Sequence, residues 1–120
     1  MAKPGKTGLS RIIKATGYSW QGLTAAWKHE AAFRQELILA LIGLPLAFWL
    51  ADNKSELLWL ILPLFILVMA ELVNSSIEAA VDRIGDEQHE LAGRAKDIGS
   101  AIVFVSLLLL AFIWFVVLYY

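Results

Sequence analysis

Five polar residues recur at helical spacing in the second half of the chain, at offsets of 3, 4, 7 and 11 from the first: Glu71, Asn74, Ser75, Glu78 and Asp82. At 3.6 residues per turn they share one face of a helix. Carboxylates can exchange protons or bind a hard divalent cation such as Mg²⁺. The pattern therefore predicts proton or metal chemistry on one side of that helix.

Two further carboxylates, Glu30 and Glu36, precede the first apolar stretch on the same side of the membrane as Glu78. If the helix of the first apolar stretch and the helix that carries Glu78 reach the membrane surface at the same depth, carboxylates from both helices converge there. Mg²⁺ suits such a site, because it prefers oxygen ligands and usually keeps waters and substrate phosphates. The alternative is that these carboxylates are solvated surface groups.

The segment from Asp82 to Asp97 is dense in charge, and its Arg94 and Lys96 are candidates to bind phosphate oxygens. The sequence has no Walker A motif, kinase glycine loop or dinucleotide fingerprint, so any nucleotide site is unconventional. His29 and His89 do not stand at a metal-ligand spacing, and we predict no zinc site. The alternative is a solvated helix and turn.

The composition places these residues in a membrane protein. The chain has 120 residues, of which 59% are hydrophobic and 18% charged, with a formal net charge of -1 and no cysteine. This is too apolar for an ordinary soluble domain, so we expect a single membrane domain over residues 1–120. The charge gives no reason to expect a nucleic-acid partner. The absence of cysteine excludes disulfides and thiolate catalysis.

Three uncharged stretches, 37–51, 57–70 and 98–120, are the candidate spans. Only the third is long enough to cross ~30 Å of hydrocarbon unaided, so the first two must extend into their flanks. We predict an all-α membrane protein with spanning helices over 30–51, 55–83 and 92–120. A soluble helical bundle is the alternative, but so small a chain has too little polar surface to cover these stretches.

Basic residues predict the orientation. Nine of the ten Lys and Arg residues lie before the first span or between the second and third, and only Lys54 lies in the other turn. The positive-inside rule then makes the N-terminus cytoplasmic and places Tyr120 outside. Glu71 falls about 14 residues, or ~21 Å, into its span, inside the inner leaflet. There a carboxylate should hold a proton, find a cation or exchange protons, unless it pairs with Arg34 or a neighbouring subunit.

The segment 5–28 is expected to form a basic amphipathic surface helix, in which Gly17 introduces a break or bend. It either lies in the headgroup plane or packs on the cytoplasmic face of the protein itself.

Four stretches together resemble the prokaryotic diacylglycerol kinase family: RIIKATGYSW (11–20), EAAFRQE (30–36), ELVNSSIEAAVDRIG (71–85) and HELAGRAKDIGS (89–100). The resemblance implies a multi-pass kinase of the bacterial cytoplasmic (inner) membrane. Such an enzyme transfers the γ-phosphoryl group of ATP to the free hydroxyl of diacylglycerol and produces phosphatidic acid. The resemblance also implies Mg²⁺, a homotrimeric helical bundle with a surface helix, and active sites shared between subunits.

The resemblance also implies roles for individual residues. Glu71 corresponds to the general base, and Glu30 and Glu78 correspond to the metal ligands. The positions implied to contact nucleotide are Arg11, Tyr18, Glu30, Glu78, Glu87, Gln88, His89, Lys96 and Asp97. Those implied to contact the lipid are Arg11, Ala15, Thr16, Gly17, Tyr18, Ser19, Trp20, Arg34, Gln35, Glu36, Trp49, Glu71 and Ser100. Two supporting polar positions are Asn74 and Asp82.

Two alternatives remain open. Related sequences act on undecaprenol, so undecaprenol kinase activity is the runner-up within the same class. A non-enzymatic helical oligomer, either proton-conducting or regulatory, is the alternative from another class. Magnesium-dependent ATP consumption that requires added lipid would discriminate between an enzyme and such an oligomer. Three helices are too few to enclose a sizeable aqueous site, so both classes favour an oligomer.

Overall fold

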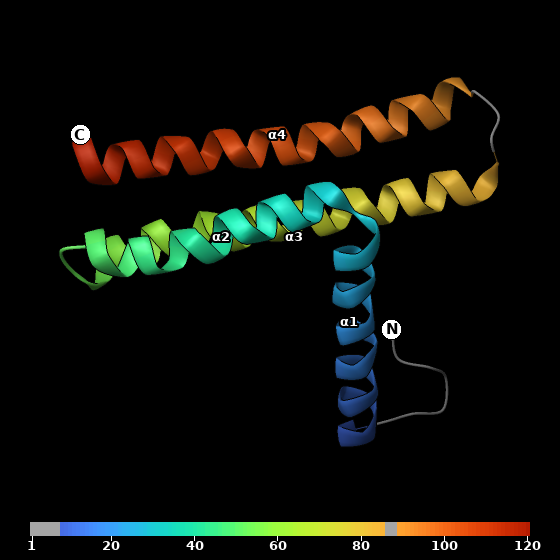
Figure 1. Ribbon diagram of the computed structural model, residues 1–120, viewed down its shortest axis with the longest axis horizontal. Coiled ribbons are helices and arrows are strands. Elements are labelled where there is room, and N and C mark those ends of the chain that lie inside the picture. Colours follow the sequence, from blue (N-terminus) through green and yellow to red (C-terminus); the bar gives the residue numbers. More distant parts are fainter. Residues whose placement is uncertain (1–7, 86–88) are drawn as a thin grey trace.

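The computed structural model describes residues 8–85 and 89–120, and within them the chain forms four helices and no strand. The helices are α1 (Gly8–His29), α2 (Ala31–Leu50), α3 (Lys54–Ile84) and α4 (Glu90–Tyr119). Helices α2, α3 and α4 run alongside one another, while α1 stands nearly perpendicular to them (Figure 1). The prediction of an all-α protein is confirmed.

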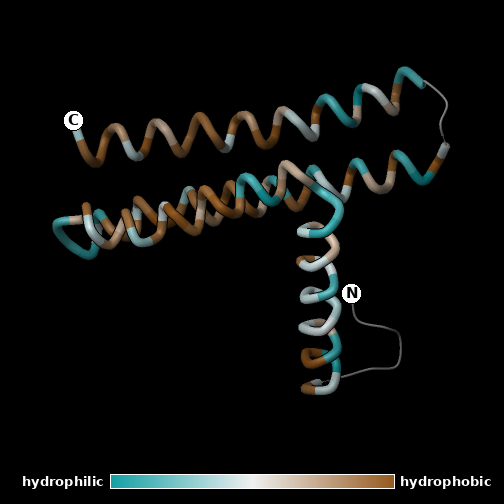
Figure 2. Tube along the Cα trace, viewed as in Figure 1, coloured by the Kyte–Doolittle hydropathy of each residue, from teal (hydrophilic) through white to brown (hydrophobic). Residues whose placement is uncertain are grey.

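Helices α2, α3 and α4 are each long and apolar enough to cross a membrane, which confirms the expected three spans. Hydrophobic residues fill the middle of these helices, and hydrophilic residues gather at the α2–α3 turn and where α3 and α4 approach their connection (Figure 2). Large apolar side chains such as Ile42, Phe65 and Phe112 are exposed along the helices. A soluble bundle would bury them, whereas lipid or another subunit can cover them. The chain is a multi-pass membrane protein.

The corner between α1 and α2 consists of one residue. Glu30 has an extended backbone, with φ -121° and ψ 105°, and this ends one helix and begins the next. The Arg34 guanidinium donates hydrogen bonds to the carbonyl oxygens of Trp27 (2.6 Å) and Lys28 (3.2 Å) in the last turn of α1. A cation there satisfies helix carbonyls that have no partner within the helix. Arg34 therefore holds the perpendicular corner.

The expected break at Gly17 is wrong, because α1 is a continuous helix from Gly8 to His29. A single glycine in a helix interior costs only about 1 kcal/mol relative to alanine, so its neighbours keep the segment helical. The part of the predicted range before residue 8 lies outside the described residues.

Helices α3 and α4 begin with side-chain caps. The Asn53 side chain accepts a hydrogen bond from the Glu56 backbone N–H (2.9 Å), and the Glu56 carboxylate accepts one from the Asp52 N–H (2.8 Å). His89 Nδ1 accepts one from the Leu91 N–H (3.0 Å). These caps satisfy N–H groups that lack partners in the first turn, and so they set where α3 and α4 start.

Helix α3 packs between α2 and α4 and carries most of the core. Leu60, Pro63, Leu64 and Leu67 are buried on it. Pro63 has no N–H, so the Trp59 carbonyl loses its helical partner, yet α3 continues past this point. One residue on, the Leu60 carbonyl accepts a hydrogen bond from Trp114 Nε1 of α4 (3.0 Å). This bond ties α4 to α3 beside the proline.

Candidate active site

The polar face of α3 turns into the protein and becomes more exposed towards the end of the helix. Glu71 is 2% exposed, and Asn74 and Ser75 are each 8% exposed. Glu78 is half-buried and Asp82 is exposed. The α3 face therefore runs from a buried carboxyl group in the membrane-spanning part to a solvated one in the last turns.

Carboxylates from two other places in the chain meet this face. Glu36 of α2, Glu78 of α3 and Glu30 at the α1–α2 corner all lie near enough to act electrostatically on Glu71. The Asn74 amide donates a hydrogen bond to Glu78 (3.5 Å). We call Glu30, Glu36, Glu71 and Glu78 the carboxylate cluster. The structure thus places the predicted base within electrostatic range of both predicted metal ligands.

The two ion pairs among the described residues do not include Glu71. Lys96 Nζ of α4 lies 2.7 Å from Asp82 Oδ1, and Glu90 pairs with Arg94 within α4 at 3.7 Å. Glu78 also acts electrostatically on Lys96. Arg34, the alternative partner for Glu71, instead donates to the backbone of α1. Lys96 therefore places one positive charge near the Glu78 end of the carboxylate cluster.

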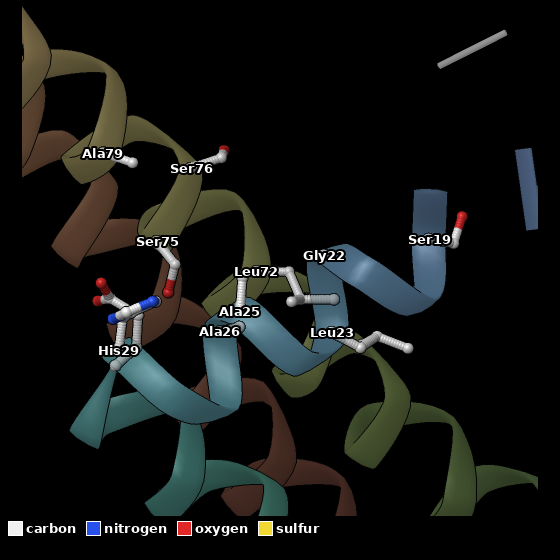
Figure 3. A pocket seen from close by; sticks show the side chains of 11 residues that line it. Ser19, Gly22, Leu23, Ala25, Ala26, His29, Leu72, Ser75, Ser76 and Ala79 are labelled. Atoms are coloured by element: carbon white, nitrogen blue, oxygen red, sulfur yellow. The ribbon is translucent and has the colours of Figure 1, made fainter. Parts of the chain in front are cut away.

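A pocket of about 550 Å³ opens between α1 and α3 next to this cluster (Figure 3). Small side chains make most of its wall, and its lining is Ser19, Gly22, Leu23, Ala25, Ala26, His29, Glu30, Leu72, Ser75, Ser76 and Ala79. We call it the α1–α3 pocket. One predicted metal ligand, Glu30, thus faces a space large enough for a polar ligand group.

Two buried polar atoms on α3 have no hydrogen-bond partner in the described structure: Asn74 Oδ1 and Ser75 Oγ. Asn74 Oδ1 abuts α4 at Gly99, where an added Cβ would lie 2.5 Å away. Buried polar groups without partners are uncommon and call for an explanation. Here both occur between Glu71 and Glu78.

Several predicted residues lie elsewhere in the single chain. Arg11 and Tyr18 precede Glu30 on α1 by about 28 Å and ~18 Å along the helix axis. Trp49 is 79% exposed near the far end of α2, and Ser100 is exposed on α4. The positions of Glu87 and Gln88 lie outside the described residues. The remaining predicted positions occur on α1 (Ala15, Thr16, Gly17, Ser19, Trp20), early in α2 (Gln35) and early in α4 (His89 as its N-cap, and Asp97).

The sequence prediction missed residues that the structure places at the site. Ser75 belonged to the predicted polar face but received no role, and His29 and Gly99 were not considered part of it. Ser75 could have been found from its offset, which puts it between Glu71 and Glu78. Gly99 carried a weaker signal. It is a small residue in an apolar helix, and small residues let membrane helices approach closely.

Comparison with known proteins shows the family to which the chain belongs. The family model described as prokaryotic diacylglycerol kinase matches residues 17–118. A diacylglycerol kinase of Escherichia coli (strain K12) is 49% identical over 113 residues, covering 94% of this chain and 93% of the relative. Those of Haemophilus influenzae and Pseudomonas aeruginosa are 49% and 46% identical, covering 90% and 92% of this chain and 92% and 89% of the relatives. The chain belongs to the prokaryotic diacylglycerol kinase family.

Proposed function

We propose that this protein transfers the γ-phosphoryl group of ATP to the free hydroxyl of diacylglycerol and so forms phosphatidic acid. Its family and relatives support the lipid substrate. The observation that carries the proposal is the burial of Glu71 on a membrane helix, next to half-buried Glu30 and Glu78. ATP cannot enter hydrocarbon and diacylglycerol hardly leaves it, so a shared site must lie at the interface, where α3 changes from buried to exposed.

Glu71 is the proposed general base. Its carboxylate accepts the proton of the lipid hydroxyl while that oxygen forms a bond to the γ-phosphorus. The bond between the γ-phosphorus and the bridging oxygen breaks, and ADP leaves with that electron pair. Glu71 lies about 10 Å lipidward of Glu78 along α3, so its position suits the lipid substrate.

Mg²⁺ is the proposed cofactor. Among the described residues, no three Asp, Glu or His side chains group closely enough to enclose a metal. The donor set of Glu30 and Glu78 still fits Mg²⁺, which binds through one or two carboxylates and completes its shell with waters and phosphate oxygens. When bound, the ion would neutralise charge on the phosphates, and Lys96 would add a cation nearby.

We further propose a cytoplasmic site in the bacterial inner membrane and a homotrimer. The basic residues on one side of the spans support a cytoplasmic N-terminus and an outer C-terminus. The exposed apolar surface of the spanning helices supports association with lipid and with other copies of the chain.

Replacing Glu71 tests the proposal directly. In detergent–lipid micelles with labelled ATP and Mg²⁺, Glu71→Gln should fold but lose phosphoryl transfer to diacylglycerol by at least about 100-fold, because it removes the base. Glu56→Gln is the matched control, since it lies at the opposite end of α3 and glutamine can serve at this capping position. Near-normal turnover in Glu71→Gln would rule out Glu71 as the general base.

The lipid is tested in the same assay. Diacylglycerol and undecaprenol in matched micelles, offered separately and in competition, should show a preference for diacylglycerol. A preference for undecaprenol would replace the proposed substrate. If ATP is not consumed with any lipid alcohol, the chain acts as a non-enzymatic oligomer instead.

A further inference from the structure

Three serines line the described α1–α3 pocket, and Ser75 is the one whose hydroxyl donates no hydrogen bond within the described structure. Ser19 Oγ donates to the Ala15 carbonyl (3.0 Å) and Ser76 Oγ donates to the Val73 carbonyl (2.7 Å). Such bonds to the preceding turn are the usual fate of serine in a helix. Ser75 Oγ is buried and has no partner in the described structure. Leaving a buried hydroxyl without a hydrogen-bond partner is energetically costly, so a bound ligand is the natural acceptor.

The position of Ser75 along α3 narrows the choice of ligand. Ser75 lies about 6 Å beyond Glu71 and ~4.5 Å before Glu78 in helix rise, on the same face. In Figure 3 its hydroxyl points from α3 towards the α1 side of the pocket, which Glu30 also lines. Ser75 therefore stands between the proposed base and the proposed metal ligands.

The transferred phosphoryl group must pass between the proposed base and the proposed metal ligands. Its non-bridging oxygens carry the charge of the transition state and need hydrogen-bond donors. Ionised Glu30, Glu71 and Glu78 can only accept hydrogen bonds. The Asn74 amide is already directed at Glu78. His29 is exposed at the end of α1 and is the other side chain of the pocket that can offer a donor. Ser75 is a neutral donor at the required depth.

We propose that the Ser75 hydroxyl donates a hydrogen bond to a non-bridging oxygen of the γ-phosphoryl group during transfer. This inference rests on the proposed kinase function. Ser75 keeps its proton throughout, so the bonds formed and broken are those between phosphorus and the attacking and leaving oxygens. The bond forms when the nucleotide binds and satisfies the hydroxyl, and it is strongest in the transition state, so its loss lowers kcat.

The test compares Ser75→Ala with Ser106→Ala. Ser106 is also a buried serine, but it lies on α4 and its hydroxyl donates to the Val103 carbonyl (2.7 Å). Ser75→Ala should lower kcat for diacylglycerol by about tenfold or more, the scale of one lost hydrogen bond to a charged group, while Ser106→Ala should leave kcat unchanged. Ser75→Thr keeps the hydroxyl and should therefore retain most of the wild-type kcat.

Two readouts separate phosphoryl binding from a structural role. The ratio of rates with ATP and ATPγS should shrink in Ser75→Ala, because sulfur accepts hydrogen bonds poorly and the variant has no such bond to lose. The ³¹P resonance of the γ-phosphorus of bound Mg²⁺–AMP-PNP should move in Ser75→Ala and stay in place in Ser106→Ala. Thermal unfolding should occur at the same or a higher temperature in Ser75→Ala, since the change removes an unsatisfied buried group.

Wild-type transfer to diacylglycerol is measured first, so a failure of the proposed function is recognised independently. If the wild type is active, a wild-type kcat in Ser75→Ala overturns the inference. So does a loss of kcat with an unchanged ATPγS ratio and an unchanged ³¹P resonance. If Ser75→Ala does not fold, the hydroxyl is structural and the inference also fails.

Discussion

Glu71 is tolerated in a membrane helix although its surroundings offer it little charge compensation. It is 2% exposed, and Glu30, Glu36 and Glu78 lie near it. Lys96 of α4 is engaged with Asp82 instead. A single chain thus concentrates negative charge where hydrocarbon gives way to water. Carboxylates held close together against their repulsion are a common way to build a cation site.

Metal titrations of glutamine variants can therefore separate the four carboxylates. We predict that Glu30→Gln and Glu78→Gln each raise the Mg²⁺ concentration needed for half-maximal activity by about tenfold or abolish activity, because each removes one oxygen ligand. Glu36→Gln should leave that concentration nearly unchanged, since the family resemblance implies that Glu36 contacts the lipid substrate and not the metal. Activity measured across a Mg²⁺ series at fixed ATP checks this. An unchanged midpoint in both Glu30→Gln and Glu78→Gln would refute ligation.

At the scale of the helices, the apolar stretches and their flanks predicted where the chain is helical. The described helices cover 8–29, 31–50, 54–84 and 90–119, where helices were expected over 5–28, 30–51, 55–83 and 92–120. The polar face of α3 also followed from spacing alone. The contacts of that face could not be predicted, because periodicity says which residues share a face and nothing about the neighbouring helix. The approach of Gly99 to Asn74 and the use of Arg34 to hold the α1–α2 corner both depend on tertiary geometry.

The α3–α4 contact at Gly99 gives a prediction about packing. We expect Gly99→Ala to destabilise the protein by about 1–3 kcal/mol, because its Cβ would lie 2.5 Å from Asn74 Oδ1 and the buried side chain must move. Displacing Asn74 should also lower activity through its bond to Glu78. Gly93→Ala is the control for stability, since an added Cβ there meets nothing within 4 Å. Unfolding in mixed micelles measures both, and equal stabilities would contradict the tight contact.

The hydrogen bond from Trp114 to Leu60 gives a second packing prediction. Trp114→Phe keeps most of the apolar ring but loses the donor to the carbonyl beside Pro63. In a membrane helix such a bond contributes about 1 kcal/mol, so the variant should unfold correspondingly earlier and remain active. Trp59→Phe is the comparison, because Trp59 is 53% exposed on α3. If both variants unfold alike, the bond does not hold α4 to α3.

At the scale of the whole molecule, the perpendicular α1 separates residues that the proposed reaction needs together. Arg11 is carried about 28 Å along α1 from Glu30, and Figure 1 shows the start of α1 far from α3. The carboxylate cluster, by contrast, is assembled from the α1–α2 corner, α2 and α3 of one chain. We therefore expect Arg11 to contact ATP at the carboxylate cluster of a neighbouring copy. The sequence could not show this separation, because it depends on the angle between α1 and the bundle.

Mixing inactive variants tests this arrangement. Arg11→Ala and Glu71→Gln should each be nearly inactive alone, but together they should regain activity when co-reconstituted. A complete site forms where the carboxylate cluster of an Arg11→Ala chain meets α1 of a Glu71→Gln chain. In a random 1:1 mixture, about one interface in four has this combination. Mixing Glu71→Gln with Glu78→Gln should restore nothing, because both carboxylates lie on α3 of the same chain and every cluster keeps one lesion. If the first mixture is no more active than its separate components, Arg11 does not complete a neighbour's site.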